Sequence, residues 1–120
     1  METIEKPVAE PAAEPVAISP FCAQFHHAVE LIGGRWTGAI VRAMLSGITR
    51  FSELTATIPG LSDRMLSERL KALEAEGVVS RTVIPDTPVR IEYHLTDKGR
   101  ALAGVVFSIA AWAEEWTEPA

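Results

Sequence analysis

The sequence predicts an α+β fold that is mainly helical. Apolar residues recur at helical spacing in four segments between residues 21 and 76, two short strand-like segments follow, and a further apolar helix leads to the C-terminus. A Pro59-Gly60 turn separates the third and fourth helical segments. Helix, turn and helix followed by a β-hairpin is the order of a winged helix-turn-helix domain. We therefore expect that architecture, with an extra helix at each end.

The first two helices are predicted from their apolar residues and the glycines between them. Phe21, Phe25 and Val29 follow one another at intervals of four, which places them on one face of a short helix. The Gly33-Gly34 pair is expected to end that helix, because glycine tolerates the positive φ of a helix C-terminus. The apolar face expected for the second helix consists of Trp36, Ile40, Val41, Met44 and Leu45.

The third and fourth helices form the predicted helix-turn-helix. Phe51, Leu54 and Ile58 mark a short third helix, for which we expect Ser52 as the N-cap. The fourth helix is expected over residues 62–76, ended by Gly77. Its apolar stripe consists of Leu66, Leu70 and Leu73.

A hairpin and one more helix complete the predicted fold. The strand-like segments 78–84 and 89–95 are separated by a loop that contains two prolines. In the second segment Ile91, Tyr93 and Leu95 alternate with polar residues, so one face is expected to be buried. Thr96 is expected to cap a last, continuous helix. Its apolar residues are Leu102, Val105, Val106, Ile109, Trp112, Ala113 and Trp116.

The charge is unevenly distributed. The chain of 120 residues has a net charge of -5, but residues 35–100 contain ten Lys and Arg against eight Asp and Glu, and the acidic excess lies at the two ends. The mildly basic centre is compatible with a DNA-binding face, although it does not demonstrate one. The single cysteine excludes an internal disulfide and a zinc site of several cysteines, which fits a reducing compartment.

The outer face of the fourth helix is the candidate DNA-reading surface. In a helix-turn-helix this face enters the major groove, where Arg64 could bind guanine O6 and N7 and Lys71 would contact phosphate. The hairpin would be the wing, with Arg90 as its phosphate or groove contact. The candidate DNA contacts are Ser62, Arg64, Ser67, Glu68, Lys71, Arg81, Thr87 and Arg90. The alternatives are a solvated polar face and a winged domain that binds a partner protein instead of DNA.

Residues 22–112 resemble the HxlR family of bacterial winged-helix regulators, which are relatives of the MarR group. The matching stretches are Cys22, residues 33–37 (GGRWT), 50–54 (RFSEL), 58–62 (IPGLS), 65–74 (MLSERLKALE), 77–79 (GVV), 89–96 (VRIEYHLT), Gly99-Arg100 and Trp112. The resemblance implies a homodimer on a two-fold symmetric operator, often near its own gene. We expect a repressor, with an activator as the alternative. The long acidic N-terminal extension departs from the family.

The resemblance also implies that the first and last helices form the dimer interface. The last helix carries more large apolar residues than a small winged core readily absorbs, which agrees with this implication. The alternative is that these side chains fold back onto their own core. The expected interface residues are Phe21, Phe25, Val29, Val105, Ile109, Trp112 and Trp116.

Cys22 is the candidate redox sensor. Several proteins of the family that this chain resembles sense electrophiles or oxidants through a cysteine near the start of the first helix. A thiol at a helix N-terminus beside a cation ionises more readily, and His26 lies one turn away. A disulfide would have to join two chains or include a small thiol. The alternative is a packed, inert cysteine. Adjacent His26 and His27 diverge too far to share a metal with Cys22, so no metal site is expected.

The predicted organisation and partners follow from these observations. We expect a disordered Pro/Ala/Glu-rich tail over residues 1–19, the DNA-binding domain with its dimerisation helices over 20–116, and a C-terminal tail over 117–120. The expected partners are double-stranded DNA and a second copy, with an oxidant or a small aromatic molecule open as effector. No catalytic set and no cofactor motif are visible, so we expect no enzyme. No leader or membrane span is visible, and we expect a bacterial cytoplasmic protein at the nucleoid.

Overall fold

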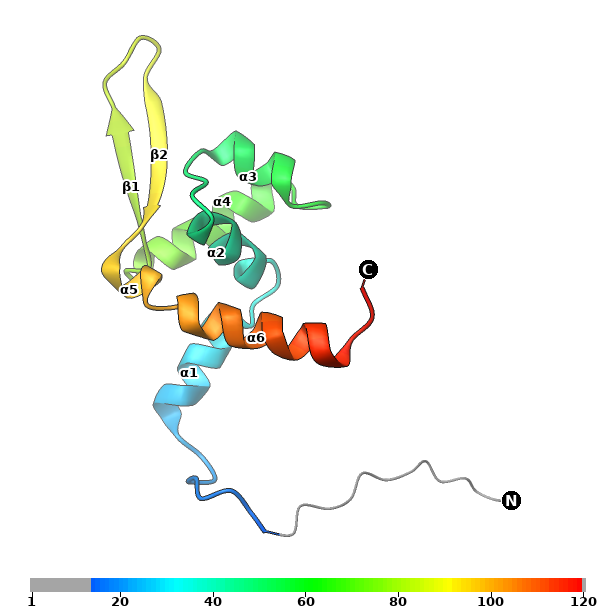
Figure 1. The fold of residues 1–120 in the computed structure, drawn as a ribbon. Coiled ribbons are helices and arrows are strands. Elements are labelled where there is room, and N and C mark those ends of the chain that lie inside the picture. Colours follow the sequence, from blue (N-terminus) through cyan, green and yellow to red (C-terminus); the bar gives the residue numbers. More distant parts are fainter. Residues whose placement is uncertain (1–13, 120) are drawn as a thin grey trace.

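The computed structural model describes residues 14–119, and those residues contain six helices and one two-stranded antiparallel sheet (Figure 1). The elements, in order, are α1 (Ala23–Ile32), α2 (Thr37–Leu45), α3 (Phe51–Thr57), α4 (Asp63–Ala75), β1 (Val79–Ile84), β2 (Arg90–Leu95), α5 (Asp97–Arg100) and α6 (Ala103–Trp116). The predicted winged helix-turn-helix fold with an extra helix at each end is confirmed. Residues 1–13 and 120 of the predicted tails lie outside the described residues.

The core lies between α2, α3, α4 and the base of the hairpin. Ile40 of α2, Leu54 of α3 and Leu66 of α4 have no exposed surface, and the rest of the predicted α4 stripe is also buried. Burial of one such side chain contributes about 1.5–3 kcal/mol of transfer free energy. This core therefore fixes which face of α4 points outward.

The turn between α3 and α4 sets the angle of the helix-turn-helix. Ile58 and Leu61 are buried on either side of Pro59-Gly60, and Gly60 has a φ of 85°, which glycine adopts without strain. The Ser62 hydroxyl accepts a hydrogen bond from the Met65 amide at 3.1 Å, so the predicted start of α4 is confirmed.

The predicted N-cap of α3 is wrong. Arg50, not Ser52, precedes the helix, with extended backbone angles and no side-chain cap bond. The Tyr93 amide donates to the Thr49 carbonyl at 2.8 Å, which holds the chain extended against β2 up to Arg50. The helix therefore begins immediately afterwards, and Ser52 lies within its first turn.

The hairpin is a wing that extends beyond the helical body (Figure 1). Its register pairs Val79 with Leu95 at the base and Ile84 with Arg90 near the loop. The strict alternation predicted for β2 is wrong, because residues 90–93 are all half-buried and only Leu95 is buried. Among residues 14–119 no buried core residue lies beneath the outer part of the hairpin, and there Arg90 contacts Asp86 and Glu92.

The predicted continuous last helix is interrupted. Thr96 caps the short α5, and its hydroxyl accepts from the Gly99 amide at 3.1 Å. Gly99 is buried against the Val78 carbonyl, with no room for a Cβ. The chain turns at Ala101-Leu102 before α6 begins, and Val106 is the buried side chain of α6. The break anchors the start of α6 on the core and lets its remainder run outward.

Candidate nucleic-acid interface

The outer face of α4 presents an exposed arginine. The Arg64 side chain is 89% exposed, and its Nε donates to Glu68 Oε2 at a long 3.4 Å. An exposed pair of this kind contributes about 0.3–0.5 kcal/mol, so little free energy is needed to detach Arg64 from Glu68. The Ser62 hydroxyl oxygen accepts the N-cap bond, and its hydrogen is still free to be donated to a phosphate.

A surface hollow joins α4 to the wing. It is lined by Ser67, Leu70, Lys71, Glu74, Arg81 and Tyr93. The fold therefore brings together three of the predicted contacts: Ser67 and Lys71 from α4, and Arg81 from β1. Within residues 14–119, neither Lys71 nor Arg81 pairs with a carboxylate. Two exposed cations thus face outward from adjoining elements.

Arg90, the predicted wing contact, is engaged by two carboxylates. Its Nη1 donates to Asp86 Oδ2 at 2.9 Å and its Nε donates to Glu92 Oε2 at 3.1 Å. His94 Nε2 lies 2.9 Å from Glu92 Oε1. The hydrogen bond with His94, and then the Arg90 guanidinium, hold the pKa of Glu92 below its usual value. The contact between Arg90 and Glu92 could have been predicted from the sequence, because residues two apart in a strand share a face.

The structure adds Arg50 to the candidate surface. This residue lines a second hollow together with residues 86–90 of the wing. Sequence reasoning passed over Arg50, because its proximity to the wing depends on the hydrogen bond between Thr49 and Tyr93, which lie far apart in the sequence.

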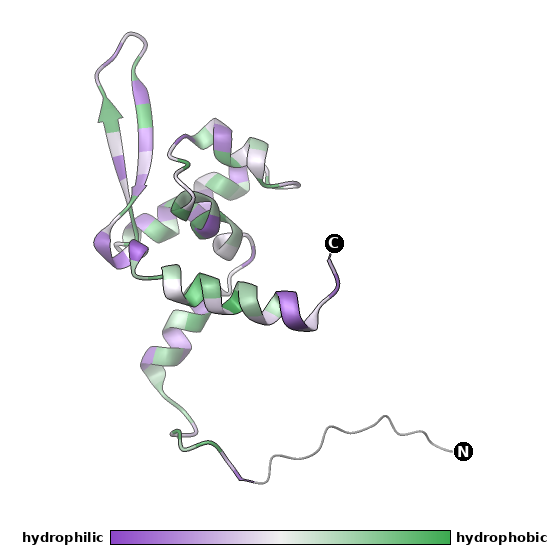
Figure 2. Cartoon of the chain, viewed as in Figure 1, coloured by the Kyte–Doolittle hydropathy of each residue, from purple (hydrophilic) through white to green (hydrophobic). Residues whose placement is uncertain are grey.

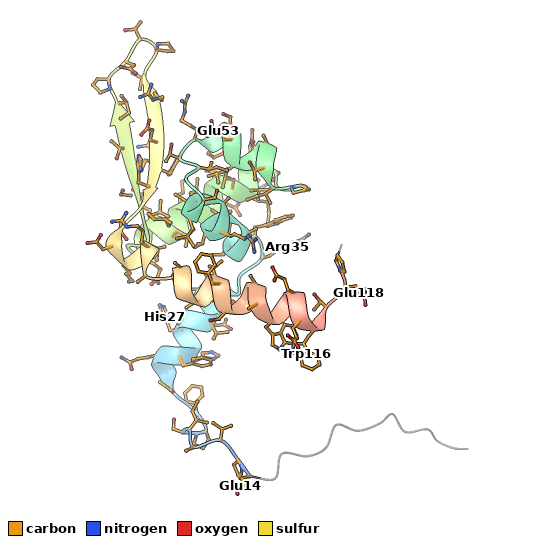
Figure 3. The ribbon with its side chains drawn as sticks, viewed as in Figure 1. Glu14, His27, Arg35, Glu53, Trp116 and Glu118 are labelled. Atoms are coloured by element: carbon orange, nitrogen blue, oxygen red, sulfur yellow. The ribbon has the colours of Figure 1, made fainter. Side chains whose placement is uncertain are left out.

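The predicted dimer residues are exposed in a single copy. Phe25 of α1 is 69% exposed and Trp112 of α6 is 61% exposed, and the other predicted interface residues are exposed as well. Helix α1 has ten residues and none is buried. Apolar residues continue along α6 well beyond Val106 (Figure 2), and Trp116 projects from α6 on the side away from the helix-turn-helix (Figure 3). In α1 only Leu31 and Ile32, at its end, pack against the core, and a ten-residue helix with so little packing is marginal in water.

An apolar hollow of about 340 Å³ lies between α1 and α6. Its apolar lining includes Phe25, Val29, Leu31, Ile32, Leu102 and Val105. At its rim His27 Nε2 lies 3.1 Å from a carboxylate oxygen of Glu76, the C-cap residue of α4. Lys98 Nζ donates to the Glu76 carbonyl at 2.6 Å. Helix α1 is thus connected to the end of the predicted DNA-reading helix.

Cys22 lies at the predicted position, as the N-cap residue of α1, and its thiol is exposed. The His26 ring packs at a tilt on Phe21, with centroids 5.7 Å apart. Among the residues described here, no hydrogen bond joins His26 to the thiol. In residues 14–119 no three His, Cys, Asp or Glu side chains gather as metal ligands. No helix in the same range is long and apolar enough to cross a bilayer.

Comparison with protein families identifies the fold and the kind of protein. A profile described as HxlR-like helix-turn-helix matches residues 31–120. The chain is 56% identical over 101 residues to the HTH-type transcriptional regulator YvaP of Bacillus subtilis, and the aligned region covers 84% of this chain and 94% of YvaP. It is 46% identical over 98 residues to the HTH-type transcriptional regulator YodB of the same organism, and the aligned region covers 82% of this chain and 88% of YodB.

Solved structures of redox-responsive relatives superpose on the chain. Reduced YodB of B. subtilis has a TM-score of 0.73 at 45% identity, covering 83% of this chain and 98% of that one. YodB is also solved diamide-treated (TM-score 0.70, 44% identity, 84% and 100% covered) and quinone-bound (TM-score 0.69, 42% identity, 80% and 100% covered). The redox regulator HypR in its oxidised form has a TM-score of 0.74 at 34% identity, covering 80% of this chain and 99% of that one.

Proposed function

Because the chain belongs to the HxlR-like helix-turn-helix family, whose members are transcriptional regulators and not enzymes, we propose that it binds a two-fold symmetric operator as a homodimer. Helix α4 would lie in the major groove and the β1–β2 hairpin along the adjacent backbone or minor groove. Half-sites would then be about one helical turn apart, or a multiple of it. We propose that the protein acts in the bacterial cytoplasm.

The observation that carries the DNA proposal is the set of outward cations on adjoining elements. Arg64 is almost fully exposed at the N-terminal half of α4, where a recognition helix contacts bases. Lys71 and Arg81 share the hollow between α4 and the wing, where the backbone of a bound duplex would run. Arg64 would therefore read a guanine, and Lys71 and Arg81 would contact phosphates.

The exposed apolar faces of α1 and α6 support the homodimer. A second copy would cover Phe25, Trp112 and Trp116 and fill the hollow between the two helices with its own apolar side chains. Burial of aromatic anchors in such a pocket is the usual source of binding energy at an interface. A small aromatic effector stays a prediction.

We further propose that Cys22 makes DNA binding responsive to oxidants and electrophiles. The relatives YodB and HypR are solved in diamide-treated, quinone-bound and oxidised forms. In this chain the thiol is exposed at the start of α1, and the same helix contacts the end of α4 through His27 and Glu76. A change at Cys22 that moves α1 would therefore reach the DNA-reading helix.

The chemistry at Cys22 has two routes. Diamide accepts two electrons and two protons from two thiols and becomes the hydrazine as the disulfide forms; with one cysteine per chain, the second thiol belongs to the other copy or to a small thiol. A quinone instead is attacked by the Cys22 thiolate: a sulfur–carbon bond forms at a ring carbon, the displaced π pair moves to a carbonyl oxygen, and uptake of one proton gives a hydroquinone thioether.

The first experiment is fluorescence anisotropy of the reduced protein with DNA from its own upstream region and with a scrambled duplex, over a salt series. We expect tight binding to the native fragment alone that weakens steeply with salt. Equal affinity for both duplexes would contradict sequence-specific binding and would favour a winged domain that serves a protein partner.

The sensor proposal is tested by the same assay after diamide treatment. We expect treated protein to lose operator affinity and a Cys22→Ser variant to keep it. Non-reducing electrophoresis distinguishes a disulfide between two copies from a mixed disulfide with a small thiol. Equal operator binding by reduced and treated protein would exclude Cys22 as the sensor.

A further inference from the structure

We propose that the hollow between the wing loop and the segment before α3 is a seat for a DNA backbone phosphate, with Arg50 as its free cation and Asp86 holding Arg90 until the phosphate arrives. The inference rests on the proposed function, because it assigns a further contact to the same DNA-binding surface. The hollow is lined by Arg50, Asp86, Thr87, Pro88, Val89 and Arg90 and has a volume of about 400 Å³.

The position of Arg50 beside the wing is built into the backbone. The Tyr93 amide donates to the Thr49 carbonyl at 2.8 Å, which ties the residue before Arg50 to the middle of β2. Phe51, the residue after it, is half-buried against the core as the first residue of α3. Arg50 is thus held between two anchored neighbours, and little backbone entropy is left to lose when its side chain binds an anion.

The charges in the hollow are unequal. Arg50 is exposed, and among residues 14–119 its guanidinium pairs with no carboxylate. Arg90 is 36% exposed and donates to both Asp86 and Glu92. Two carboxylates already balance the charge of Arg90, so it attracts a further anion only weakly. Arg50 is therefore the cation that first attracts a phosphate.

Asp86 is the partner that a phosphate would replace. Its side chain is 52% exposed, whereas that of Glu92 is 21% exposed and also contacts His94. Exposed ion pairs are weak, so exchange of Asp86 for a phosphate on Arg90 Nη1 costs little. Glu92 would keep its bond to Arg90 Nε at 3.1 Å and so hold the guanidinium in place during the exchange. By neutralising part of the charge of Arg90, Asp86 would therefore weaken the attraction of the wing for DNA of any sequence.

A duplex backbone is the occupant that the arrangement fits. Helix α3, which Arg50 directly precedes, contacts both β2 of the wing and α4, the helix that carries Arg64 and Lys71. Phosphates follow one another along a strand at regular intervals, and a duplex that lies on α4 also presents its backbone to elements flanking the groove. The occupant of the hollow would therefore be one phosphate of a bound DNA strand and not a free anion.

The test is the salt dependence of DNA affinity for the full chain, by fluorescence anisotropy, on both the native and the scrambled duplex. We expect Arg50→Gln to weaken binding to both duplexes equally and to make the slope of log affinity against log salt shallower by about one. Arg42→Gln removes the same charge from α2 beside Phe107 of α6 and should leave the slope unchanged. An unchanged slope for Arg50→Gln would contradict the proposal that Arg50 binds a DNA phosphate.

The exchange is tested by Asp86→Asn alone and combined with Arg90→Gln. We expect Asp86→Asn to tighten binding by up to about five-fold, the worth of an exposed ion pair, and this gain to vanish in the Arg90→Gln background. A gain that persists there would mean that Asp86 acts only through its charge, and a loss of affinity would mean that it shapes the wing; either overturns the exchange. Equal affinity of the unaltered protein for both duplexes would instead contradict the proposed function, and the Arg50 slope would still be measurable.

Discussion

Helices α2, α3 and α4 bury their apolar side chains within one copy, whereas α1 and α6 leave most of theirs exposed. Leu54, Leu66 and Ile40 have no exposed surface, while Phe25, Trp112 and Trp116 are all exposed. Helix α1 has an apolar stripe as clear as those of α2 and α4, yet none of its residues is buried, so periodicity alone does not distinguish a core from an interface. The difference shows that the apolar side chains of the helix-turn-helix form one core, and it supports the proposal that a second copy covers the outer helices.

The largest effect is expected from the core. Leu66→Ala should lower the free energy of unfolding by about 2–5 kcal/mol, because it removes a fully buried side chain and leaves a cavity. Urea unfolding at several protein concentrations measures this loss, which should be the same at each. Ile109→Ala is the matched control on α6, with a loss expected only at concentrations where dimers form. A concentration-independent loss for Ile109→Ala would break the distinction between the two regions.

The outer helices should lose association instead of folding. Trp112→Ala should weaken the dimer by at least about 2 kcal/mol, roughly thirty-fold in the dissociation constant, if the indole is an anchor of the interface. Sedimentation equilibrium measures the constant directly. Val83→Ala removes a similarly exposed apolar side chain from the wing and should leave the constant unchanged. Equal constants for the Trp112→Ala variant and the unaltered protein would place the interface elsewhere.

The outward face of α4 should affect DNA binding without affecting stability. Arg64→Ala should cost about 1–3 kcal/mol of specific affinity and relax the preference at one base pair, because a bidentate contact to guanine is lost. Anisotropy with a set of singly substituted operators measures both effects. Lys71→Ala is the comparison: it should weaken binding to every sequence alike. A uniform loss for Arg64→Ala would make Arg64 a phosphate contact as well.

The sequence predicted the order of elements, the α4 stripe and the start of α4 at Ser62 because each depends on residues close together in the chain. It missed the start of α3 at Phe51, because that boundary is set by a hydrogen bond from Tyr93 to Thr49, which are distant in sequence. The break at Gly99 depends on contact with Val78 and was missed for the same reason.

The candidate site followed a similar division. The polar face of α4 could be read from helical spacing, whereas the proximity of Arg50 to the wing and the two carboxylates on Arg90 required the folded hairpin. Exposed apolar residues on α6 could be anticipated from their excess over what one small core holds, an argument about volume that needs no contacts.

The smallest effect is expected in the wing, where charged groups replace the missing core. The hydrogen bond with His94 and the Arg90 guanidinium lower the pKa of Glu92 below its usual 4.5, so folding favours the carboxylate. That contribution to stability is present above pH 4.5 and is lost as the pH falls through the lowered pKa of the folded state. Glu92→Gln keeps the shape and removes the charge. Urea unfolding of this variant and the unaltered protein should therefore differ at neutral pH and converge in acid, with the unaltered protein the more stable. A difference that is constant with pH would show that Glu92 acts through packing alone, and the wing would then resemble the core more closely than its exposure indicates.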